Sequence, residues 1–584
     1  MTEPRRRRLD RRSPTAAGVV RALHARPGEP ADPLVRRWPS RTPVVVAVLF
    51  FALAQTPSLL PRSWLLQGLV GGITAAIGYG LGAFLEMASR PLRRRLDAGR
   101  RAPSERVAWA VVAGVSAVVV VVSLWTGRLQ QRETRALVGM AEDQPWYTPL
   151  IVAVAVLIVA LAVLLARSVR LGARLVRRLI DRVAPAWVAS ALAGLVAALV
   201  VGGVVQGLLL GSFFDLAERS AAAANRTVPD GVAPPDAATR SGGPGSLVPW
   251  ESLGAKGQAF VSGGPSPAQI GELADVDPVD PVRVYVGVDS AEELEDRVAL
   301  ALAELDRTGA WDRSVLVVAT ATGTGWVNPE AVDALEYLTG GDSAVVSLQY
   351  GYLPSWVSVL LDPSTASHAG QALFDAVHER WSALPAGARP QLAVYGESLG
   401  SYGAEGAFDD LDELLGRTDA ALLVGPTNAN PLWNEMLRSR EPGSPVWLPE
   451  PARAPQVVVA DAPADLPDPT PPDDAVVPEV VYLQNSSDPV VWWNPSLLWE
   501  QPAWLHGELG RDVSPSMRWY PVVTFWQVAV DLALAAEVPP GHGHRYEPEI
   551  VHAWVALLAP QAWTAADTEA LEDLVVPPWP PAGG

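Results

Sequence analysis

The sequence predicts an α/β domain with a mainly parallel sheet, preceded by an N-terminal region of five transmembrane helices. Long uncharged runs fill the first 211 residues, whereas short apolar runs alternate with helical patterns in the remainder. With 584 residues, the chain is too long for one ordinary domain. The expected regions are a disordered basic tail at 1–42, a transmembrane region at 43–214, a linker at 215–280, the α/β domain at 281–575 and a tail at 576–584.

Five runs have the length and the apolar character of a membrane-spanning helix. They lie at Pro43–Leu60, Trp64–Met87, Val107–Trp125, Pro149–Ala166 and Ala186–Phe214. The second run is rich in glycine, which would let neighbouring helices approach closely. Buried helices of a soluble protein are a poor alternative, because five charge-poor runs in succession leave nothing polar to cover them.

Arginines indicate how these helices are oriented. The tail and the segments 90–106 and 167–182 are basic, whereas the short loop at Arg62 and the loop 126–148 are not. By the positive-inside rule the N-terminus is cytoplasmic, and an odd number of spans places everything after Phe214 outside the cytoplasm. A cleavable signal peptide is disfavoured, since about forty residues precede the first apolar run. We therefore expect a multi-pass protein of the cell membrane with an extracytoplasmic α/β domain.

Charge and cysteine content exclude several classes of protein. Residues 212–584 hold 17 basic and 52 acidic side chains, a net charge of −35. Such a field attracts cations and argues against a nucleic-acid partner, although solubility is its simplest purpose. The basic tail is better explained as a topology signal than as a nucleic-acid-binding segment. The chain contains no cysteine, which excludes disulfides, a thiol nucleophile and a thiolate metal site.

The α/β domain is predicted from strands that alternate with helices. Strands are expected at Val282–Val288, Ser314–Thr320, Ala344–Tyr350, 392–395, Ala420–Val424 and Val480–Leu483. Helices are expected at Ala291–Asp306, Pro329–Leu338, Ser367–Leu384 and 399–408. In such sheets the working residues follow the carboxyl ends of the strands. Residues 441–479, rich in proline and acids, are expected to form a surface insertion with no strand before Asp461.

One motif carries the strongest chemical signal. Gly396-Glu-Ser-Leu-Gly400 directly follows the apolar strand at 392–395 and fits the G-x-S-x-G nucleophile elbow. A serine on a sharp strand-to-helix turn needs a glycine two residues before it and two after it, because side chains there would strike the neighbouring backbone. The motif also arises by chance, so the strand before it and the helical pattern after it matter. Ser398 is the candidate nucleophile.

Acidic and basic partners for this serine follow later in the chain. Asp488 lies in a turn after the strand at 480–483 and precedes Pro489. It would orient a histidine, with simple capping of the turn as the alternative. His542 and His544 share the loop Gly541-His-Gly-His544, and either could act as general base. We favour His542 for its distance from the following helix. A metal site at the two histidines is a weaker alternative, because no carboxylate cluster accompanies them, and no cofactor is expected.

The oxyanion hole requires two backbone N–H groups. Leu399, directly after the nucleophile, should supply one of them. The other is expected from Gly323, Thr324 or Gly325, in the glycine-containing loop after the strand at 314–320. An ordinary tight turn is an equal alternative for this loop. It lacks the G-K-[ST] ending of a phosphate-binding loop, which argues against a nucleotide.

With these residues the chain resembles an actinobacterial membrane-bound α/β-hydrolase family, which joins a multi-span N-terminal region to an α/β-hydrolase domain. The resemblance covers roughly residues 43 to 575 and has the Ser, Asp, His order of that fold. Its most specific segments are Thr322–Trp326, Gly396–Ser401, Ser487–Val490 and Pro540–His544. The resemblance implies an esterase or lipase-like activity with Ser398 as nucleophile.

The expected reaction is hydrolysis of an acyl or aminoacyl ester, with a lipid in the membrane as the substrate and an acyl-enzyme as intermediate. The negative field would favour a cationic head group. Six tryptophans are expected in exposed loops, where they would suit a lipid: Trp433, Trp447, Trp492, Trp493, Trp499 and Trp504. Acyl transfer to a cell-envelope acceptor would use the same residues. A catalytically silent membrane scaffold is the alternative outside enzymes.

Overall fold

The computed structural model describes residues 40–96, 104–142, 147–180, 212–273, 277–354, 364–467, 476–558 and 563–579, with a few single residues between these ranges. The chain divides into two compact units. Unit 1 comprises Met1–Ala52, Gly71–Val122 and Pro149–Ser212, and unit 2 comprises Leu53–Val70, Ser123–Thr148 and Phe213–Gly584. The expected basic tail at 1–42 lies almost entirely outside the described residues.

Three helices of the described N-terminal part are long and apolar enough to cross a membrane, rather than the five expected. They belong to α3 (Trp64–Leu96), α4 (Glu105–Leu137) and α5 (Thr148–Ile180). The first expected run forms only α2 (Arg41–Leu53), whose 13 residues span roughly 20 Å against a hydrocarbon core of about 30 Å. Pro57 and Pro61 explain why this helix does not continue, since proline cannot donate to a helical hydrogen bond. The fifth expected run, Ala186–Phe214, lies mostly outside the described residues.

The glycines of α3 allow close helix packing inside unit 1. A Cβ atom added at Gly72 would lie 2.8 Å from Ile158 of α5, and one at Gly78 would lie 2.8 Å from Phe50 of α2. Larger residues at these positions would force the helices apart. The expectation of close contact along this run is therefore confirmed.

Unit 2 is built on a sheet of seven parallel strands in the order β1-β3-β2-β4-β5-β7-β6. The strands are β1 (Val282–Val286), β2 (Val315–Thr320), β3 (Ser343–Leu348), β4 (Gln391–Glu397), β5 (Ala420–Val424), β6 (Val457–Ala460) and β7 (Val480–Leu483). Nearly every strand residue is buried, as continuous apolar strands of a parallel sheet require. The expected mainly parallel α/β fold is confirmed.

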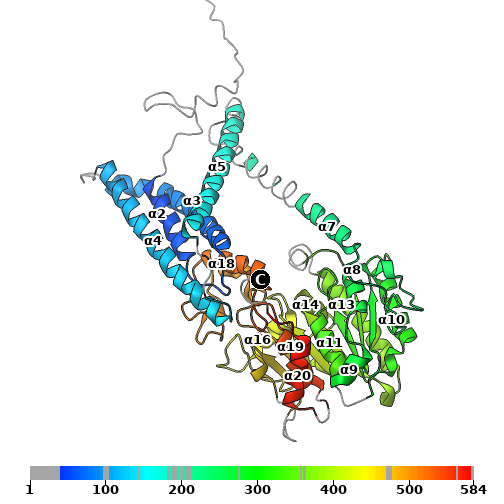
Figure 1. Ribbon diagram of the computed structural model, residues 1–584. Helices are drawn as coiled ribbons and strands as arrows, with labels where there is room; N and C mark the ends of the chain where they lie inside the picture. The colour runs from blue at the N-terminus through cyan, green and yellow to red at the C-terminus, as the bar shows by residue number, and fades with distance from the viewer. Residues whose placement is uncertain are drawn as a thin grey trace, which may run out of the picture. The chain divides into compact units, whose positions relative to one another are not determined.

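Helices precede, separate and follow the strands (Figure 1). They are α7 (Ser212–Asn225), α8 (Gly254–Ser262), α9 (Pro267–Leu273), α10 (Leu294–Thr308), α11 (Pro329–Leu338), α13 (Ser364–Ser382), α14 (Leu399–Glu405), α15 (Leu411–Arg417), α16 (Pro431–Ser439), α17 (Pro489–Trp492), α18 (Val523–Asp531), α19 (Glu547–Leu558) and α20 (Ala565–Val575). Helix α13 contacts both α10 and α14, while α19 contacts α11 and α20. Of these helices, α8, α10, α11, α13, α14 and α19 pack against the sheet and contact its strands directly. The loops that follow the strands lie at the carboxyl ends of the strands.

The six expected strands are all present, and one strand was not expected. Strand β6 lies inside the proline-rich segment 441–479 and pairs with β7 at the edge of the sheet. The expectation that no strand precedes Asp461 is therefore wrong. Four residues between proline-rich stretches give too short a pattern to identify, and only pairing with β7 makes them a strand.

Candidate active site

The turn after β4 has the strained geometry that a nucleophile elbow requires. Ser398 has φ 57° and ψ −122°, which few non-glycine residues adopt. A Cβ atom on Gly396 would strike the carbonyl oxygen of Gly400, and one on Gly400 would strike that of Thr320. Both glycines are therefore needed for the turn to close. The turn leaves the Ser398 side chain partly exposed, between β4 and the first turn of α14.

Asp488 and His544 form an acid–histidine pair. Nδ1 of His544 lies 2.6 Å from Oδ2 of Asp488, whose side chain is fully buried. The hydroxyl of Tyr546 also donates to this Oδ2 at 2.6 Å, and Oδ1 accepts the N–H of Val490 at 2.8 Å. With Nδ1–H directed at the carboxylate, Nε2 carries the lone pair. Among the described residues Nε2 of His544 has no hydrogen-bond partner.

Neighbouring strands bring this pair to the same edge of the sheet as Ser398. The N–H of Ser398 donates to the carbonyl of Val424 at 2.9 Å, at the end of β5. A Cβ atom on the next residue, Gly425, would lie 2.5 Å from Cε1 of His544. Because β5 lies between β4 and β7, the turns that carry Ser398 and Asp488 flank the imidazole. The geometry pairs His544 with Asp488, so the preference for His542 in this role is not supported.

Charges around His544 favour its protonated form. Burial by itself lowers the pKa of His544, but the Asp488 carboxylate and the charges of Glu397 and Glu547 outweigh it, so this pKa lies above its usual value. Glu397 is fixed by hydrogen bonds from the Asn328 amide and the Tyr395 hydroxyl, each at 2.8 Å. The imidazole is therefore surrounded by carboxylates that stabilise a positive charge on it.

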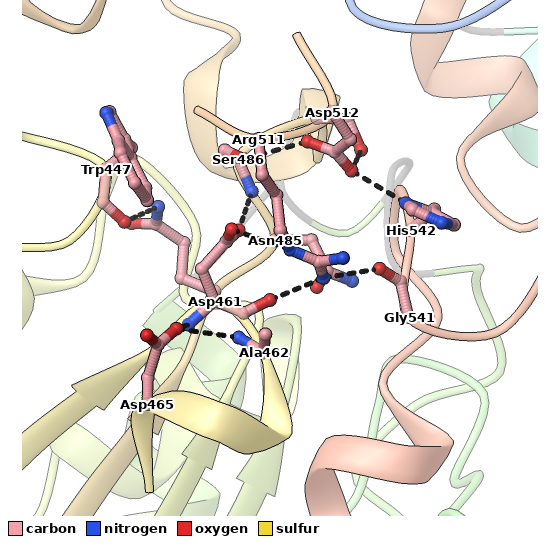
Figure 2. Close-up of polar contacts among 12 residues, drawn as sticks. Trp447, Asp461, Ala462, Asp465, Asn485, Ser486, Arg511, Asp512, Gly541 and His542 are labelled. Atoms are coloured by element: carbon pink, nitrogen blue, oxygen red, sulfur yellow. Dashed lines mark hydrogen bonds and ion pairs between the residues drawn. The ribbon is translucent and has the colours of Figure 1, made fainter. Parts of the chain in front are cut away.

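His542 belongs to a second acid–histidine pair on the same loop. Its Nδ1 lies 2.9 Å from Oδ2 of Asp512 (Figure 2). Asp512 also accepts hydrogen bonds from the hydroxyls of Ser486 and Ser487. Burial raises the pKa of Asp512, but the bonds from His542 and the two serines outweigh it and lower this pKa. The imidazoles of His542 and His544 therefore form hydrogen bonds with two different carboxylates, Asp512 and Asp488.

A network of polar groups holds the loop 541–545, which we call the base loop. Figure 2 shows Arg511 between Asp461 and Gly541, with Nη2 donating to the carbonyl of Gly541 at 2.9 Å. The side-chain amide of Asn485 donates to the carbonyls of Gly543 and Arg545 at 3.0 and 3.1 Å. The sequence did not identify Arg511 or Asn485 as supporting residues. Asp512 and Arg511 follow no strand, so no local pattern marks them.

The loop after β2 lies next to the elbow, because Thr320 of β2 is in register with Gly396 of β4. It is a tight turn in which the N–H of Gly325 donates to the carbonyl of Thr322 at 2.8 Å. Gly325 has φ +84°, and a Cβ atom there would strike the hydroxyl of Tyr285. The amide of Gly325 therefore serves the turn itself. Gly323 and Thr324 lie between these two hydrogen-bonded positions.

The tryptophans are less exposed than expected. Trp433, Trp492 and Trp504 are buried in the core, with 1%, 5% and 6% of their surface exposed. Trp499 is 67% exposed. Trp447 and Trp493 are partly buried and pack against the core. The expectation of six exposed-loop tryptophans is thus confirmed only for Trp499, and the others contribute to packing.

Comparison with known proteins agrees with this architecture. Residues 282–571 match the model of an alpha/beta-hydrolase family, and residues 55–265 match the model of the N-terminus of such a family. No curated protein and no solved structure shows detectable similarity to the chain. The first match covers the whole sheet and every candidate site residue, and the second covers the segments between the apolar helices. The chain therefore belongs to the alpha/beta-hydrolase family.

Proposed function

We propose that the protein is a membrane-tethered serine hydrolase that cleaves a carboxylic ester through an acyl-enzyme on Ser398. The observation that carries the proposal is the His544–Asp488 pair, whose Nε2 has no partner among the described residues and lies at the same sheet edge as the strained Ser398. Catalytic serines need this arrangement, because the hydroxyl is a weak nucleophile until a base removes its proton.

Each residue has a defined role in the proposed reaction. Nε2 of His544 takes the proton of the Ser398 hydroxyl as its oxygen attacks the ester carbonyl, and Asp488 stabilises the imidazolium that forms. The N–H of Leu399 and an amide from residues 323–324 would bind the oxyanion. The imidazolium returns its proton to the departing alcohol, which leaves Ser398 acylated. Water, activated by the same histidine, then releases the acid.

A substrate presented by the membrane is supported by the position of the base loop. Leu60 of the α2–α3 connection lies beside Gly543, at 3.5 Å from a Cβ atom built there. Four residues later Trp64 begins α3 and stacks edge-on against Tyr147, with ring centroids 6.0 Å apart, where α5 is about to begin. Tryptophan and tyrosine at helix ends are typical of the membrane surface. We propose that the ester belongs to a lipid, with an acyl or aminoacyl group as the part transferred to Ser398.

Activity-based labelling tests the catalytic claim. A fluorophosphonate probe should label the wild-type protein in membranes, with the label mapped to Ser398 by mass spectrometry and lost in Ser398→Ala. Ser401→Ala, three residues away on α14, should retain the label as a matched control. Absence of labelling in folded wild-type protein would refute the proposal. Release of free acid from vesicles carrying an ester lipid, compared with a soluble ester, then tests the substrate.

The proposed topology places the hydrolase domain outside the cytoplasm and the basic segments 90–106 and 167–182 on the cytoplasmic side. It is supported by unit 2, which contains the segments around Arg62 and 123–148 together with the hydrolase domain. These are the loops that the arginine pattern assigns to the outside. The chain has no cysteine, so single cysteines report topology cleanly. An impermeant maleimide should label Glu142→Cys and Glu569→Cys in intact cells, but not Glu105→Cys, and the reverse pattern would invert the assignment.

A further inference from the structure

Two segments between the N-terminal helices are part of the core of the hydrolase domain. We call residues 54–63, between α2 and α3, and 138–142, after α4, the connecting segments. They belong to unit 2 together with residues 213–584. Leu59, Leu60 and Val138 are fully buried and join the same hydrophobic cluster as the central strands. The core of the hydrolase domain therefore includes side chains from the N-terminal region.

A buried ion pair fastens the first connecting segment to α18. Nε of Arg62 lies 2.9 Å from Oδ1 of Asp531, and both side chains are 0% exposed. The backbone N–H of Leu59 also donates to Oδ2 of Asp531, at 3.1 Å. Because neither charge can return to water without opening the core, the pair fixes the segment and the end of α18 in one geometry.

Further hydrogen bonds extend this attachment to both sides. The amide of Gln527, one turn earlier on α18, donates to the carbonyl of Thr56 at 3.0 Å. The N–H of Arg62 donates to the side chain of Gln131 on α4 at 2.7 Å. Arg62 thus links the end of α18 to α4, the helix that precedes the second connecting segment.

The attachment continues directly to the candidate base. Asp531 ends α18, a short helical turn at Leu532–Leu534 follows, and the carbonyl of Ala535 then accepts the backbone N–H of His544 at 2.8 Å. On the other side Leu60 lies beside Gly543, and a Cβ atom on Gly139 would lie 4.0 Å from Nε2 of His542. The base loop is therefore in contact with both connecting segments.

We propose that the connecting segments form the seat of the base loop, and that Arg62, acting through Asp531 and Ala535, is a positioning residue for His544. This inference rests on the proposed function and adds that the N-terminal region is part of the catalytic apparatus as well as a tether. The size of the effect follows from catalytic geometry, since a shift of about 1 Å in a reacting group can cost about 100-fold in rate.

The test uses full-length protein in detergent or vesicles with a soluble short-chain ester. Arg62→Leu leaves a buried carboxylate unpaired and could prevent folding, so the double variant Arg62→Leu/Asp531→Leu, which replaces the pair by apolar groups, is examined beside it. Arg380→Leu, on α13, removes a partly exposed ion pair with Asp306 that lies outside both connecting segments and serves as the control. For each variant, the melting temperature, kcat, KM and the pH profile are measured.

We expect the double variant to fold and bind substrate with an unchanged KM, but to lose at least about tenfold in kcat. The acidic limb of its pH profile should also move to lower pH, because a displaced His544 loses contact with Asp488. Arg380→Leu should behave as wild type. A double variant that folds and keeps both the wild-type kcat and the wild-type acidic limb would overturn the positioning role.

A chemical readout separates this inference from the proposed function. Diethylpyrocarbonate modifies neutral imidazole, and its rate at His544 can be followed by mass mapping whether or not Ser398 is reactive. A seat that holds His544 against Asp488 predicts faster modification of His544 in the double variant than in wild type. Equal rates of His544 modification in the double variant and the wild type would refute the proposed role of the connecting segments. Missing probe labelling at Ser398 in wild type would reject the hydrolase proposal alone.

Discussion

Two histidines of the base loop, two residues apart, each pair with a buried carboxylate, but the surroundings of the two pairs differ. His544–Asp488 and His542–Asp512 have similar lengths, 2.6 and 2.9 Å, and both carboxylates are buried. Asp488 follows β7 and is bound further by Tyr546, whereas Asp512 follows no strand and is bound further by two serine hydroxyls. Nε2 of His544 has no hydrogen-bond partner among the described residues, while Nε2 of His542 lies near Gly139.

The difference shows that a carboxylate beside a histidine does not by itself define a catalytic base. The deciding feature is what the second ring nitrogen can reach, because proton transfer needs the reacting hydroxyl within hydrogen-bonding distance. In His544 this nitrogen has no hydrogen-bond partner among the described residues. In His542 it faces the second connecting segment, so the pair contributes to holding the loop. The following predictions test that division of roles.

Removal of each imidazole should give the largest contrast. His544→Ala should lower ester hydrolysis by about 10,000-fold or more, as loss of a triad base does. His542→Ala should lower it by less than about tenfold, since its loss affects the loop only indirectly. Initial rates and probe labelling on equal amounts of folded protein measure both. Comparable losses in the two variants would show that the pairs do not have separate roles.

Neutralising each carboxylate should follow the same order with a smaller effect. Asp488→Asn leaves the wrong tautomer of His544 in place and should cost about 10,000-fold in kcat or slightly less. Asp512→Asn should leave kcat within about tenfold, while the weaker acceptor lowers the free energy of unfolding by about 1–2 kcal/mol. Steady-state kinetics and urea denaturation distinguish the two. A larger kinetic effect at Asp512 would assign catalysis to the second pair.

The pH profile provides a sharper test of the charges at His544. A general base works only when neutral, so activity should fall as pH drops through the pKa of His544, which its carboxylate neighbours raise above the usual value for histidine. Glu547→Gln removes a charge that raises this pKa and should move the midpoint to lower pH. Glu569→Gln, on the exposed face of α20, should leave it unchanged. An unchanged midpoint in Glu547→Gln would mean that a group other than His544 controls the fall in activity at low pH.

The smallest effect is expected from the hydroxyls around each carboxylate. Tyr546→Phe removes one hydrogen bond from Asp488 and should lower kcat by about three- to tenfold, in keeping with about 1 kcal/mol for such a bond. Ser487→Ala removes one from Asp512 and should change the melting temperature more than kcat. Equal effects on kcat would argue against separate roles for the two carboxylates.

The sequence was sufficient for elements with strong local patterns. Six strands and the elbow at Ser398 were predicted because each is marked by an apolar run or by two obligatory glycines. Strand β6 was missed because its four residues become a strand only by pairing with β7. The number of apolar helices was overestimated where Pro57 and Pro61 interrupt the first run.

The residues of the candidate site also differ in how clearly the sequence marks them. Asp488 was recognised from its turn after a strand, whereas Asp512 carries no such mark. His542 and His544 could not be distinguished along the chain, since both lie in one glycine-flanked repeat and only the folded loop directs each imidazole to its own carboxylate. The bond between Arg62 and Asp531 joins residues that are 469 positions apart, so no local pattern could reveal it.

That separation has a consequence for how the protein is made. At about 5–20 residues per second, Arg62 leaves the ribosome roughly half a minute to a minute and a half before Asp531 exists. During this interval the guanidinium has no carboxylate to meet, and Leu59 and Leu60 have no core to enter. A nascent chain that stops before residue 531 therefore keeps an unsatisfied charge beside an apolar helix, a feature by which quality control could recognise an unfinished molecule.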